Sequence, residues 1–531
     1  MNDTKKCAGW KLLTAVCLLP LVLYAGPAER QAGKPGRFQI EEADIAQVHA
    51  AMKAEQLTCR DLVGQYLKRI EAFDKKGPAL NAIVQVNPDA LKEADELDRR
   101  FARGGLTGPL HCVPAIVKDN FETIGLQSAD GSLSLKGFVS DKDAFLVKRI
   151  KAAGAIVIAK SNMGEFAFSP LETVNSILGT TKNPYALDRV PAGSSGGTAA
   201  AVAANFGLVG LGSDTGNSIR GPSSHTALVG MRSTMGLTSR AGVIPLSYLA
   251  DIAGPMARTV EDAVRVFQVI VGEDPEDPMT ARGRGRAIPD YKSSLVRGGL
   301  KEARIGVLRQ AYEREGLPVD DEITKVFARA LEDMKAAGAE IIDPAPVDLS
   351  GIQRSRDGNP CRGFKYDINE YLARRGDRAP VHSLDEIVSS GKFHESVRNR
   401  LERAQRDNPE GPGSDACNKE AAYREAFGAA VNKTMDELKL DAFVYPTWSR
   451  PPQLIGSVNQ REAGDNSQVF SPTSGFPAIN VPMGYTHDTL PCGMTIFGRA
   501  WSEATLIRIA YAYEQATRHR RPPNCCSEVR P

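Results

Sequence analysis

Apolar runs without internal polar residues are the feature that most constrains the fold of this chain. The runs VPAIV at 113–117 and AIVIAK at 155–160 are continuous rather than alternating, which is typical of strands buried on both faces. Between them, LVKRIKAAG at 146–154 has the spacing of an amphipathic helix. Strands buried on both faces occur where helices cover a sheet, so this order predicts an α/β fold.

The same alternation of strand and helix extends through the rest of the chain. Further strands are predicted at 207–214, 303–309, 339–344, 441–447 and 478–484, and further helices at 198–205 and 321–338. Residues from 40 to about 103 have helical spacing throughout, whereas 350–420 is polar and holds only weak helices. No linker is strong enough to divide the chain. We therefore expect one large domain with a central mixed β-sheet flanked by helices.

The composition allows a large buried core and gives no sign of a nucleic-acid partner. Of the 531 residues, 42% are hydrophobic and 24% are charged, which is ordinary for a globular protein. The 66 basic and 64 acidic residues leave a formal net charge of +2. No basic excess of the kind that binds a phosphate backbone is present, so we expect no nucleic acid among the partners.

The N-terminus has the pattern of a secretory signal peptide. Three lysines among the first eleven residues precede the apolar run 12–23, and small residues follow at Ala25 and Ala28. The run is shorter than the roughly 20 apolar residues of a membrane span. The sequence therefore predicts a signal peptide at 1–28, a polar linker at 29–37 and export to the periplasm or the extracellular space, without stable membrane insertion. The alternative is an ordinary buried N-terminal helix.

Cysteine and histidine spacing predicts no metal site. Two of the nine cysteines lie within the first 28 residues, and the remaining seven show no CxxC spacing. An odd number leaves at least one thiol unpaired within the chain, and one or two disulfides fit an exported protein, with the pairing left open. The seven histidines show no ligand spacing either. We expect no metal and no cofactor.

A loop rich in glycine and hydroxyl side chains, GSDTGNSIRGPSSH at 212–225, is the strongest local signal of a functional site. Such a segment brings backbone N–H groups close to a developing negative charge. A formal G-x-S-x-G match at 193–197 follows NPYALDRVPA, which has no strand, so it lacks the context of a nucleophile elbow. A dinucleotide fingerprint fails because Thr215 occupies the third glycine position.

Lys118 is the best candidate for a base, because it ends the apolar run 113–117. Burial at the end of a strand disfavours the charged form of lysine and lowers its pKa. A neutral lysine can act as a general base toward a hydroxyl. The alternative is a structural pair between Lys118 and Asp119 at the sheet edge.

Several long motifs in a fixed order resemble the amidase signature family of hydrolases. They are LHCVPAIVKDNFET, GAIVIAKSNMGEFAFS, NPYALDRVPAGSSGGTAAAVAA, GSDTGNSIRGPSS, DAFVYPT, SPTSGFPAINVPMGY and GRAWSEATLIRIAYAYEQATRHRRPP. The resemblance implies an amidase signature domain at 38–523, which leaves a C-terminal tail at 524–531.

The resemblance also implies the catalytic residues. In that family a lysine, a serine on a cis peptide bond and a nucleophilic serine act together, and these match Lys118, Ser194 and Ser218. Ser195 matches a second serine that supports the lysine. The separation of 24 residues between Ser194 and Ser218 (218 − 194) agrees with the family pattern.

The resemblance places the oxyanion hole and its supports in the loop at 212–225. The backbone N–H groups of the hole are those of Thr215, Gly216, Asn217 and Ser218, and the residues that brace the loop are Asp214 and Arg220.

Three positions depart from the family pattern. Asn217 stands where glycine or aspartate is usual, and either its tolerance of positive φ or a contact of its amide with substrate would explain it. Ala192 and Cys112 replace glycines, and because both are small we expect neither to disturb the site.

The function implied is hydrolysis of a carboxylic amide, at its C–N bond, to carboxylate and ammonia or amine through an acyl-enzyme, with ester hydrolysis as a side activity. The expected partner is a small-molecule amide of unspecified class, and a homodimer is left open. Two alternatives compete. The glutaminase subunit of a tRNA-dependent amidotransferase is disfavoured by the export signal, and a non-catalytic binding protein is disfavoured by the complete set Lys118, Ser194 and Ser218.

Overall fold

Eleven strands form one mixed β-sheet within residues 38–355, 358–459 and 462–527, the parts of the chain that this computed structural model describes. The strands are β1 (Ile83–Val86), β2 (Pro114–Lys118), β3 (Ile156–Ser161), β4 (Val209–Asp214), β5 (Val229–Arg232), β6 (Ile252–Ala257), β7 (Arg304–Val307), β8 (Glu340–Ile342), β9 (Ala442–Pro446), β10 (Ala478–Thr486) and β11 (Leu490–Phe497). Their order across the sheet is β1-β3-β2-β4-β6-β5-β10-β11-β9-β7-β8. The predicted signal peptide (1–28) and linker (29–37) lie outside the described residues.

The sheet has two parallel regions separated by an antiparallel middle, and the edge strand β1 pairs antiparallel with β3. Strand β2 pairs in parallel with β3 and β4, and β7 pairs in parallel with β8 and β9. The strands from β4 through β6, β5, β10 and β11 to β9 are antiparallel neighbours. Every residue of β2, β3 and β4 is buried, which agrees with the continuous apolar runs.

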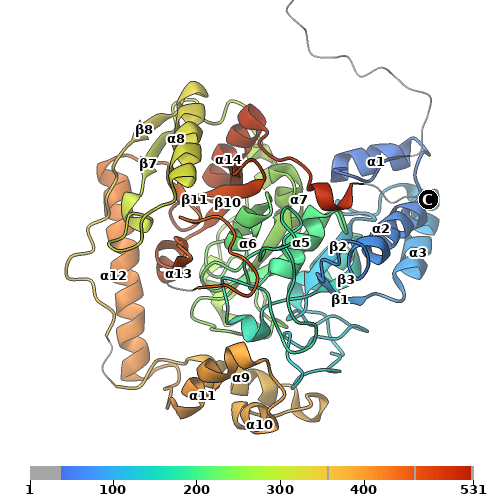
Figure 1. Ribbon diagram of the computed structural model, residues 1–531, viewed down its shortest axis with the longest axis horizontal. Helices are drawn as coiled ribbons and strands as arrows, with labels where there is room; N and C mark the ends of the chain where they lie inside the picture. Colours follow the sequence, from blue (N-terminus) through green and yellow to red (C-terminus); the bar gives the residue numbers. More distant parts are fainter. Residues whose placement is uncertain (1–37, 356–357, 460–461, 528–531) are drawn as a thin grey trace, which may run out of the picture. The chain divides into compact units, whose positions relative to one another are not determined.

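Helices cover the sheet along its length (Figure 1). They are α1 (Ile45–Lys53), α2 (Cys59–Phe73), α3 (Ala90–Gly104), α4 (Phe145–Ala152), α5 (Gly196–Ala203), α6 (Arg220–His225), α7 (Val260–Ile270), α8 (Asp321–Ala336), α9 (Phe364–Ala373), α10 (Leu384–Ser390), α11 (Arg398–Arg406), α12 (Asp415–Glu437), α13 (Phe470–Ser474) and α14 (Glu503–Thr517). Helix α5 contacts β2 and β4, α6 contacts β5, β10 and β11, and α8 contacts β8, β9 and β10. The predicted central mixed sheet flanked by helices is confirmed.

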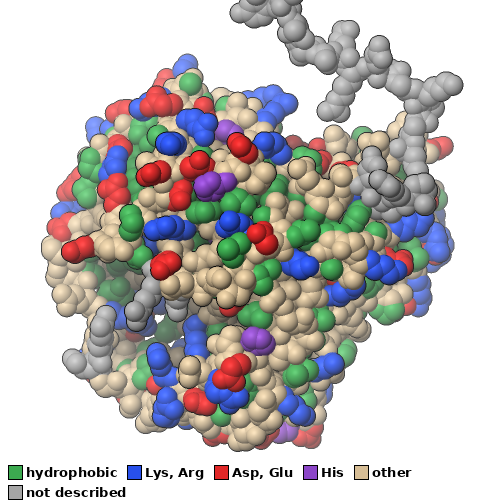
Figure 2. All heavy atoms as spheres, in the orientation of Figure 1, with side chains coloured by type: hydrophobic (Ala, Val, Ile, Leu, Met, Phe, Trp, Pro, Cys, Tyr) green, Lys and Arg blue, Asp and Glu red, His purple; other side chains and the backbone are tan. Residues whose placement is uncertain are grey.

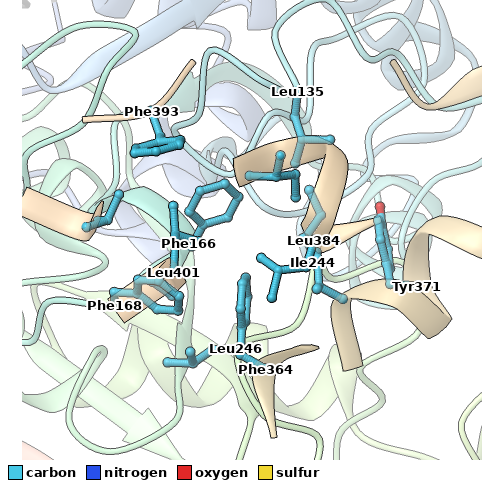
Figure 3. Packing of buried hydrophobic residues seen from close by; sticks show 14 of the residues in the cluster. Leu135, Phe166, Phe168, Ile244, Leu246, Phe364, Tyr371, Leu384, Phe393 and Leu401 are labelled. Carbon is cyan, nitrogen blue, oxygen red and sulfur yellow. The ribbon is translucent and has the colours of Figure 1, made fainter. Parts of the chain in front are cut away.

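Within the region 350–420 the helices α9, α10 and α11 pack on one another, and α12 begins at Asp415. Their apolar residues form one buried cluster with residues from loops of the sheet, as Figure 3 shows. The Phe364 ring of α9 lies 4.7 Å from the Phe168 ring and 5.7 Å from the Phe166 ring, measured between centroids. These helices looked weak in the sequence because each buries its few apolar residues only against the others and against these loops.

Four strands were not predicted from the sequence, namely β1, β5, β6 and β11. The helical prediction over 40–103 was wrong at Ile83–Val86, where β1 pairs antiparallel with β3. Strands β5 (VGMR) and β6 (IAGPMA) contain glycine or proline, which lowers intrinsic strand propensity. Their pairing with β4 and β10 in the interior of the sheet overrides that preference.

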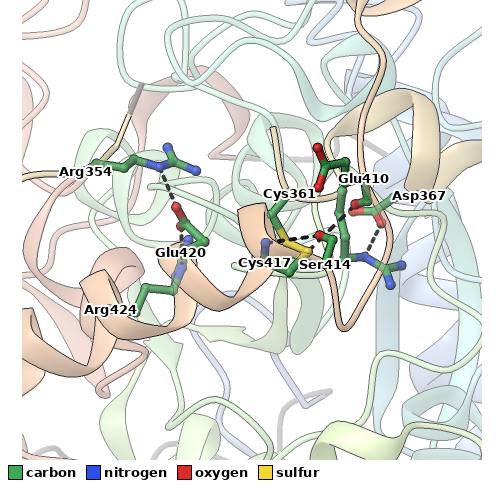
Figure 4. Close-up of a disulfide and its surroundings, with 9 residues drawn as sticks. Arg354, Cys361, Asp367, Glu410, Ser414, Cys417, Glu420 and Arg424 are labelled. Carbon is green, nitrogen blue, oxygen red and sulfur yellow. Dashed lines mark hydrogen bonds and ion pairs between the residues drawn. A yellow bond between two sulfur atoms is a disulfide. The ribbon is translucent and has the colours of Figure 1, made fainter. Parts of the chain in front are cut away.

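The described residues contain three disulfides, one more than the one or two that the sequence led us to expect, and their pairing had been left open. The pairs are Cys59–Cys112, Cys361–Cys417 and the adjacent Cys525–Cys526, and Cys492 is a buried free thiol. The Cys361–Cys417 bond joins the loop before α9 to the first turn of α12 (Figure 4). In that turn the Ser414 hydroxyl accepts the Cys417 N–H at 3.2 Å and caps the helix.

The end of the described chain packs on the domain. Asn524–Cys526, within the tail predicted at 524–531, forms a short 3-10 turn in which Cys526 is buried. Arg69 of α2 donates from Nη2 to the Cys526 carbonyl at 2.5 Å. The C-terminal turn is therefore tied to the N-terminal helices.

Two further features are the hydrophobicity of the helices and the distribution of charge on the surface. No helix within the described residues is both long enough and apolar enough to cross a membrane. On the face drawn in Figure 2, basic and acidic side chains lie interspersed. This mixture matches the nearly balanced charge of the sequence.

Candidate active site

The carboxyl ends of two neighbouring parallel strands bring the predicted residues together. Lys118 is the last residue of β2, and Thr215 follows the end of β4, its parallel neighbour. Parallel neighbours end at the same edge of a sheet, so the lysine and the glycine-rich loop share that edge. Ser194 lies two residues before α5, and Ser195, which directly precedes the helix, donates its N–H to the Ser218 carbonyl at 3.3 Å. The two serine segments are therefore adjacent.

Lys118 is fully buried, and its ammonium nitrogen contacts two serine hydroxyls. The distance from Lys118 Nζ is 2.7 Å to Ser194 Oγ and 2.8 Å to Ser213 Oγ. Burial lowers the pKa of Lys118 to about 7, against the opposing effect of Asp130, Asp251 and Asp214.

The alternative pairing of Lys118 with Asp119 does not occur. The Asp119 carboxylate instead accepts backbone N–H groups from Ala129 at 3.2 Å and Gly131 at 3.1 Å. Asp119 therefore holds the neighbouring turn, and Lys118 is left facing hydroxyl groups.

A second buried lysine, Lys160 near the end of β3, also has its pKa lowered by burial, to about 8, but its two shortest contacts are of a different kind. Lys160 Nζ donates to the carbonyls of Phe121 at 2.6 Å and Gln127 at 2.8 Å. Carbonyl oxygens only accept, so they favour the N–H-rich ammonium, whereas a hydroxyl can also donate to a neutral amine. The close partners of Lys118 are hydroxyls, and these suit both of its protonation states.

Ser194 and Ser195 are placed by a tightly packed turn. The Gly193–Ser194 peptide bond is cis. A Cβ at residue 193 would lie 2.3 Å from the Glu172 carbonyl oxygen, so only glycine fits there. The Ser195 hydroxyl donates to the Ser213 carbonyl at 3.2 Å and reaches Lys118 through that residue. Sequence reasoning missed Ser213, although it directly precedes Asp214 in the loop motif.

The loop that follows β4 leaves four consecutive N–H groups free. None of the backbone N–H groups of Thr215, Gly216, Asn217 and Ser218 donates a hydrogen bond to an acceptor among the described residues. Ser218 itself is 4% exposed. In the described part of the chain, the Ser218 hydroxyl makes no hydrogen bond to the Ser194 hydroxyl, which contacts Lys118 instead. Free N–H donors beside a hydroxyl suit the binding of a carbonyl oxygen that becomes negative.

Asp214 braces this loop between two arginines. Its carboxylate lies 3.1 Å from Arg220 Nε and 3.0 Å from Arg232 Nη1, and all three side chains are fully buried. Burial alone would raise the Asp214 pKa, but the two guanidinium groups lower it to about 2. Arg220 also donates to the Gly216 carbonyl at 2.6 Å, and Arg232 to the Asp214 carbonyl. The sequence identified Asp214 and Arg220 but missed Arg232, which lies on β5.

The three departures from the family pattern have different structural settings. Asn217 does not adopt a positive φ, so backbone tolerance does not explain it. Its amide is buried beside Asp465, and neither amide atom forms a hydrogen bond of good geometry with a described residue. Ala192 and Cys112 have φ of 66° and 56°, in the left-handed region that favours glycine. Replacement of glycine at these positions therefore strains the backbone, even though both side chains are small. A non-glycine residue at positive φ costs about 1–3 kcal/mol.

The described residues contain no group of three or more histidine, cysteine, aspartate or glutamate side chains arranged to hold a metal ion.

Comparisons with known proteins identify the family. The family model described as Amidase matches residues 61–507. The chain is 33% identical to a probable amidase of Arabidopsis thaliana over 522 residues, which covers 95% of each chain. It is 32% identical to a glutamyl-tRNA(Gln) amidotransferase subunit of Acinetobacter baumannii, with 90% of this chain and 96% of the relative covered.

A solved structure agrees with this assignment. The native peptide amidase of Stenotrophomonas maltophilia superimposes with a TM-score of 0.81 and 36% sequence identity, over 91% of this chain and 98% of the other. The chain belongs to the amidase signature family. It is an amide-hydrolysing enzyme of that family.

Proposed function

We propose that the enzyme hydrolyses a carboxylic amide to carboxylate and ammonia or amine, with Ser218 as nucleophile, Ser194 as proton relay and Lys118 as base. The observation that carries this proposal is the 2.7 Å contact between the buried Lys118 Nζ and Ser194 Oγ. A lysine whose pKa is about 7 is substantially neutral at physiological pH, and so can accept a proton.

The reaction proceeds in two halves. Ser218 attacks the amide carbon while its proton passes to Ser194, which in turn gives a proton to Lys118. The carbonyl oxygen becomes negative within reach of the free N–H groups of residues 215–218, which stabilise it. The leaving amine takes the proton back through Ser194, and water then hydrolyses the acyl-enzyme by the same route.

A covalent label tests the identity of the nucleophile. A fluorophosphonate probe is expected to modify one residue, Ser218, because its hydroxyl lies among the free N–H donors of residues 215–218, whereas the Thr215 hydroxyl of the same loop is bonded to Asp251. Peptide mass spectrometry reads the site of the adduct, and the Ser218→Ala variant serves as control, since it is expected to carry no adduct. An adduct on Ser194 or Ser195 instead would contradict the assignment.

The known relatives suggest two substrate settings. Peptide amidases are among the structural neighbours, and amidotransferase subunits are among the sequence relatives. We favour a free-standing amidase over an amidotransferase component because the first 28 residues have the pattern of an export signal.

Export is the second part of this proposal and has its own measurement. Expression of the full chain in a bacterial host is expected to give a mature protein that begins after Ala25 or Ala28. The mature N-terminus is read by mass spectrometry of the exported fraction. A protein that keeps Met1 and stays in the cytoplasm would revive the amidotransferase alternative.

A further inference from the structure

A buried carboxylate that the relay does not use contacts the first residue of the oxyanion loop. Asp251 is 6% exposed, and its Oδ1 accepts the Thr215 hydroxyl at 2.5 Å. Its other oxygen accepts the N–H groups of Leu246 at 3.0 Å and Ser247 at 2.9 Å. The carboxylate therefore ties Thr215 to the turn formed by residues 246–251.

The same turn is tied to the loop at a second point. Arg232 donates from Nη2 to the Ala250 carbonyl at 2.8 Å and from Nη1 to the Asp214 carbonyl. Asp214 and Thr215 are consecutive, so the turn holds both the last residue of β4 and the first residue of the loop. Two buried charged groups, Asp251 and Arg232, make these ties, and hydrogen bonds to charged groups are the stronger kind.

The other side of the turn forms part of a cavity wall. Tyr248 and Leu249 line a cavity of about 1310 Å³, whose lining also includes residues of α9 and α12. The Tyr248 N–H donates to the Asp367 carboxylate of α9 at 2.8 Å. The Arg362 guanidinium lies 5.3 Å from the centre of the Tyr248 ring. The turn thus connects this cavity wall with the start of the oxyanion loop.

We propose that Asp251 is a positioning residue for amide hydrolysis, which orients the N–H groups of residues 215–218 by holding the Thr215 hydroxyl. Nothing else among the described side chains hydrogen-bonds that hydroxyl. The inference rests on the proposed function, because it assigns Asp251 to the oxyanion loop of that reaction.

Removal of the Thr215 hydroxyl tests the inference. Thr215→Val keeps the size of the side chain and is expected to lower kcat about 10- to 100-fold with KM within about threefold, because the loop donors act mainly on the transition state. Thr215→Ser keeps the hydroxyl and is expected to recover most of that loss. Asp251→Asn removes the carboxylate and is expected to lower kcat in the same way, by a similar factor.

A double variant and a matched control separate positioning from stability. Because one hydrogen bond is shared, Thr215→Val combined with Asp251→Asn is expected to lose no more than the worse single variant. The control is Ser239→Ala, which removes another buried hydroxyl–carboxylate contact of 2.5 Å, from Ser239 to Asp274, away from the loop. It is expected to lower Tm and leave kcat within about twofold.

Two results would overturn the inference. One is a Thr215→Val enzyme with kcat near that of the wild type, and the other is fully additive losses in the double variant. In either case labelling of Ser218 in the wild-type enzyme would leave the proposed function standing. Absence of Ser218 labelling in the wild type would instead remove the proposed function itself.

Discussion

Replacement of Lys118 by alanine is expected to lower kcat/KM by about 10²- to 10⁴-fold, the range that a positioned general base contributes. Lys118 must be neutral to accept a proton from Ser194, and burial lowers its pKa to about 7. In the wild-type enzyme kcat/KM is therefore expected to be low in acid, to rise through a midpoint near pH 7 and then to level off. In Lys118→Ala this rise is expected to disappear.

Two control variants test whether a neutral amine at position 118 is what the reaction requires. Lys118→Arg is expected not to recover activity, because a guanidinium stays protonated in proteins. His225→Ala is expected to retain the pH profile, since the His225 ring is buried against Trp448, with 4.7 Å between ring centroids. A Lys118→Ala enzyme of near-normal activity, together with an inactive His225→Ala, would contradict the lysine assignment.

Replacement of Asp214 by asparagine is expected to lower the free energy of unfolding by about 3–5 kcal/mol, because it leaves two buried guanidinium groups without a counter-charge. Arg220 and Arg232 are both fully buried against this carboxylate. Denaturant unfolding measures the loss. Glu332→Gln is the control, since the exposed pair of Lys335 and Glu332 is expected to contribute under about 1 kcal/mol.

The ion pairs of Asp214 with Arg220 and Arg232 also determine how the stability of the protein is expected to depend on pH. The folded-state pKa of Asp214 is about 2, below the ordinary value of 3.8. Its contribution is therefore fully present above the unfolded-state pKa and is lost as the pH falls from about 4 toward 2. In Asp214→Asn that part of the acid dependence is expected to be absent. If Asp214→Asn lowered the free energy of unfolding by less than about 1 kcal/mol, the two arginines would not depend on this carboxylate as expected. If the variant kept the acid dependence of the wild type, other groups would determine the stability in acid.

Sequence patterns predicted the parts of the fold that local periodicity determines. The continuous runs at 113–117 and 155–160 correspond to β2 and β3, and the spacing at 321–338 corresponds to α8. Periodicity failed at β1, where four residues are too few to show a repeat and pairing with β3 decides the conformation. It failed also for α9–α11, whose burial depends on residues distant in sequence.

In the candidate site, too, residues in local motifs could be predicted and residues that act through distant contacts could not. Motif matching marked Lys118, Ser194 and Ser218, and the structure places the segments of all three at one edge of the sheet. Arg232 and Asp251 lie outside the loop motif and reach it only through the folded chain. A single sequence gives no signal for such contacts, since each joins groups that are 18 or 36 residues apart.

The disulfide between Cys361 and Cys417 closes the intervening 55 residues into a loop, which we call the module and which can vary as one unit. The Cα atoms of the two cysteines are 4.6 Å apart, so the segment leaves the main body and returns to it at almost the same point. Substitution of this module, or a change in its length, need not alter the path of the sheet. Because Arg362, Glu370 and Arg374 within it line the large cavity, evolution can remodel the cavity by altering this module while the sheet that carries Lys118 stays as it is.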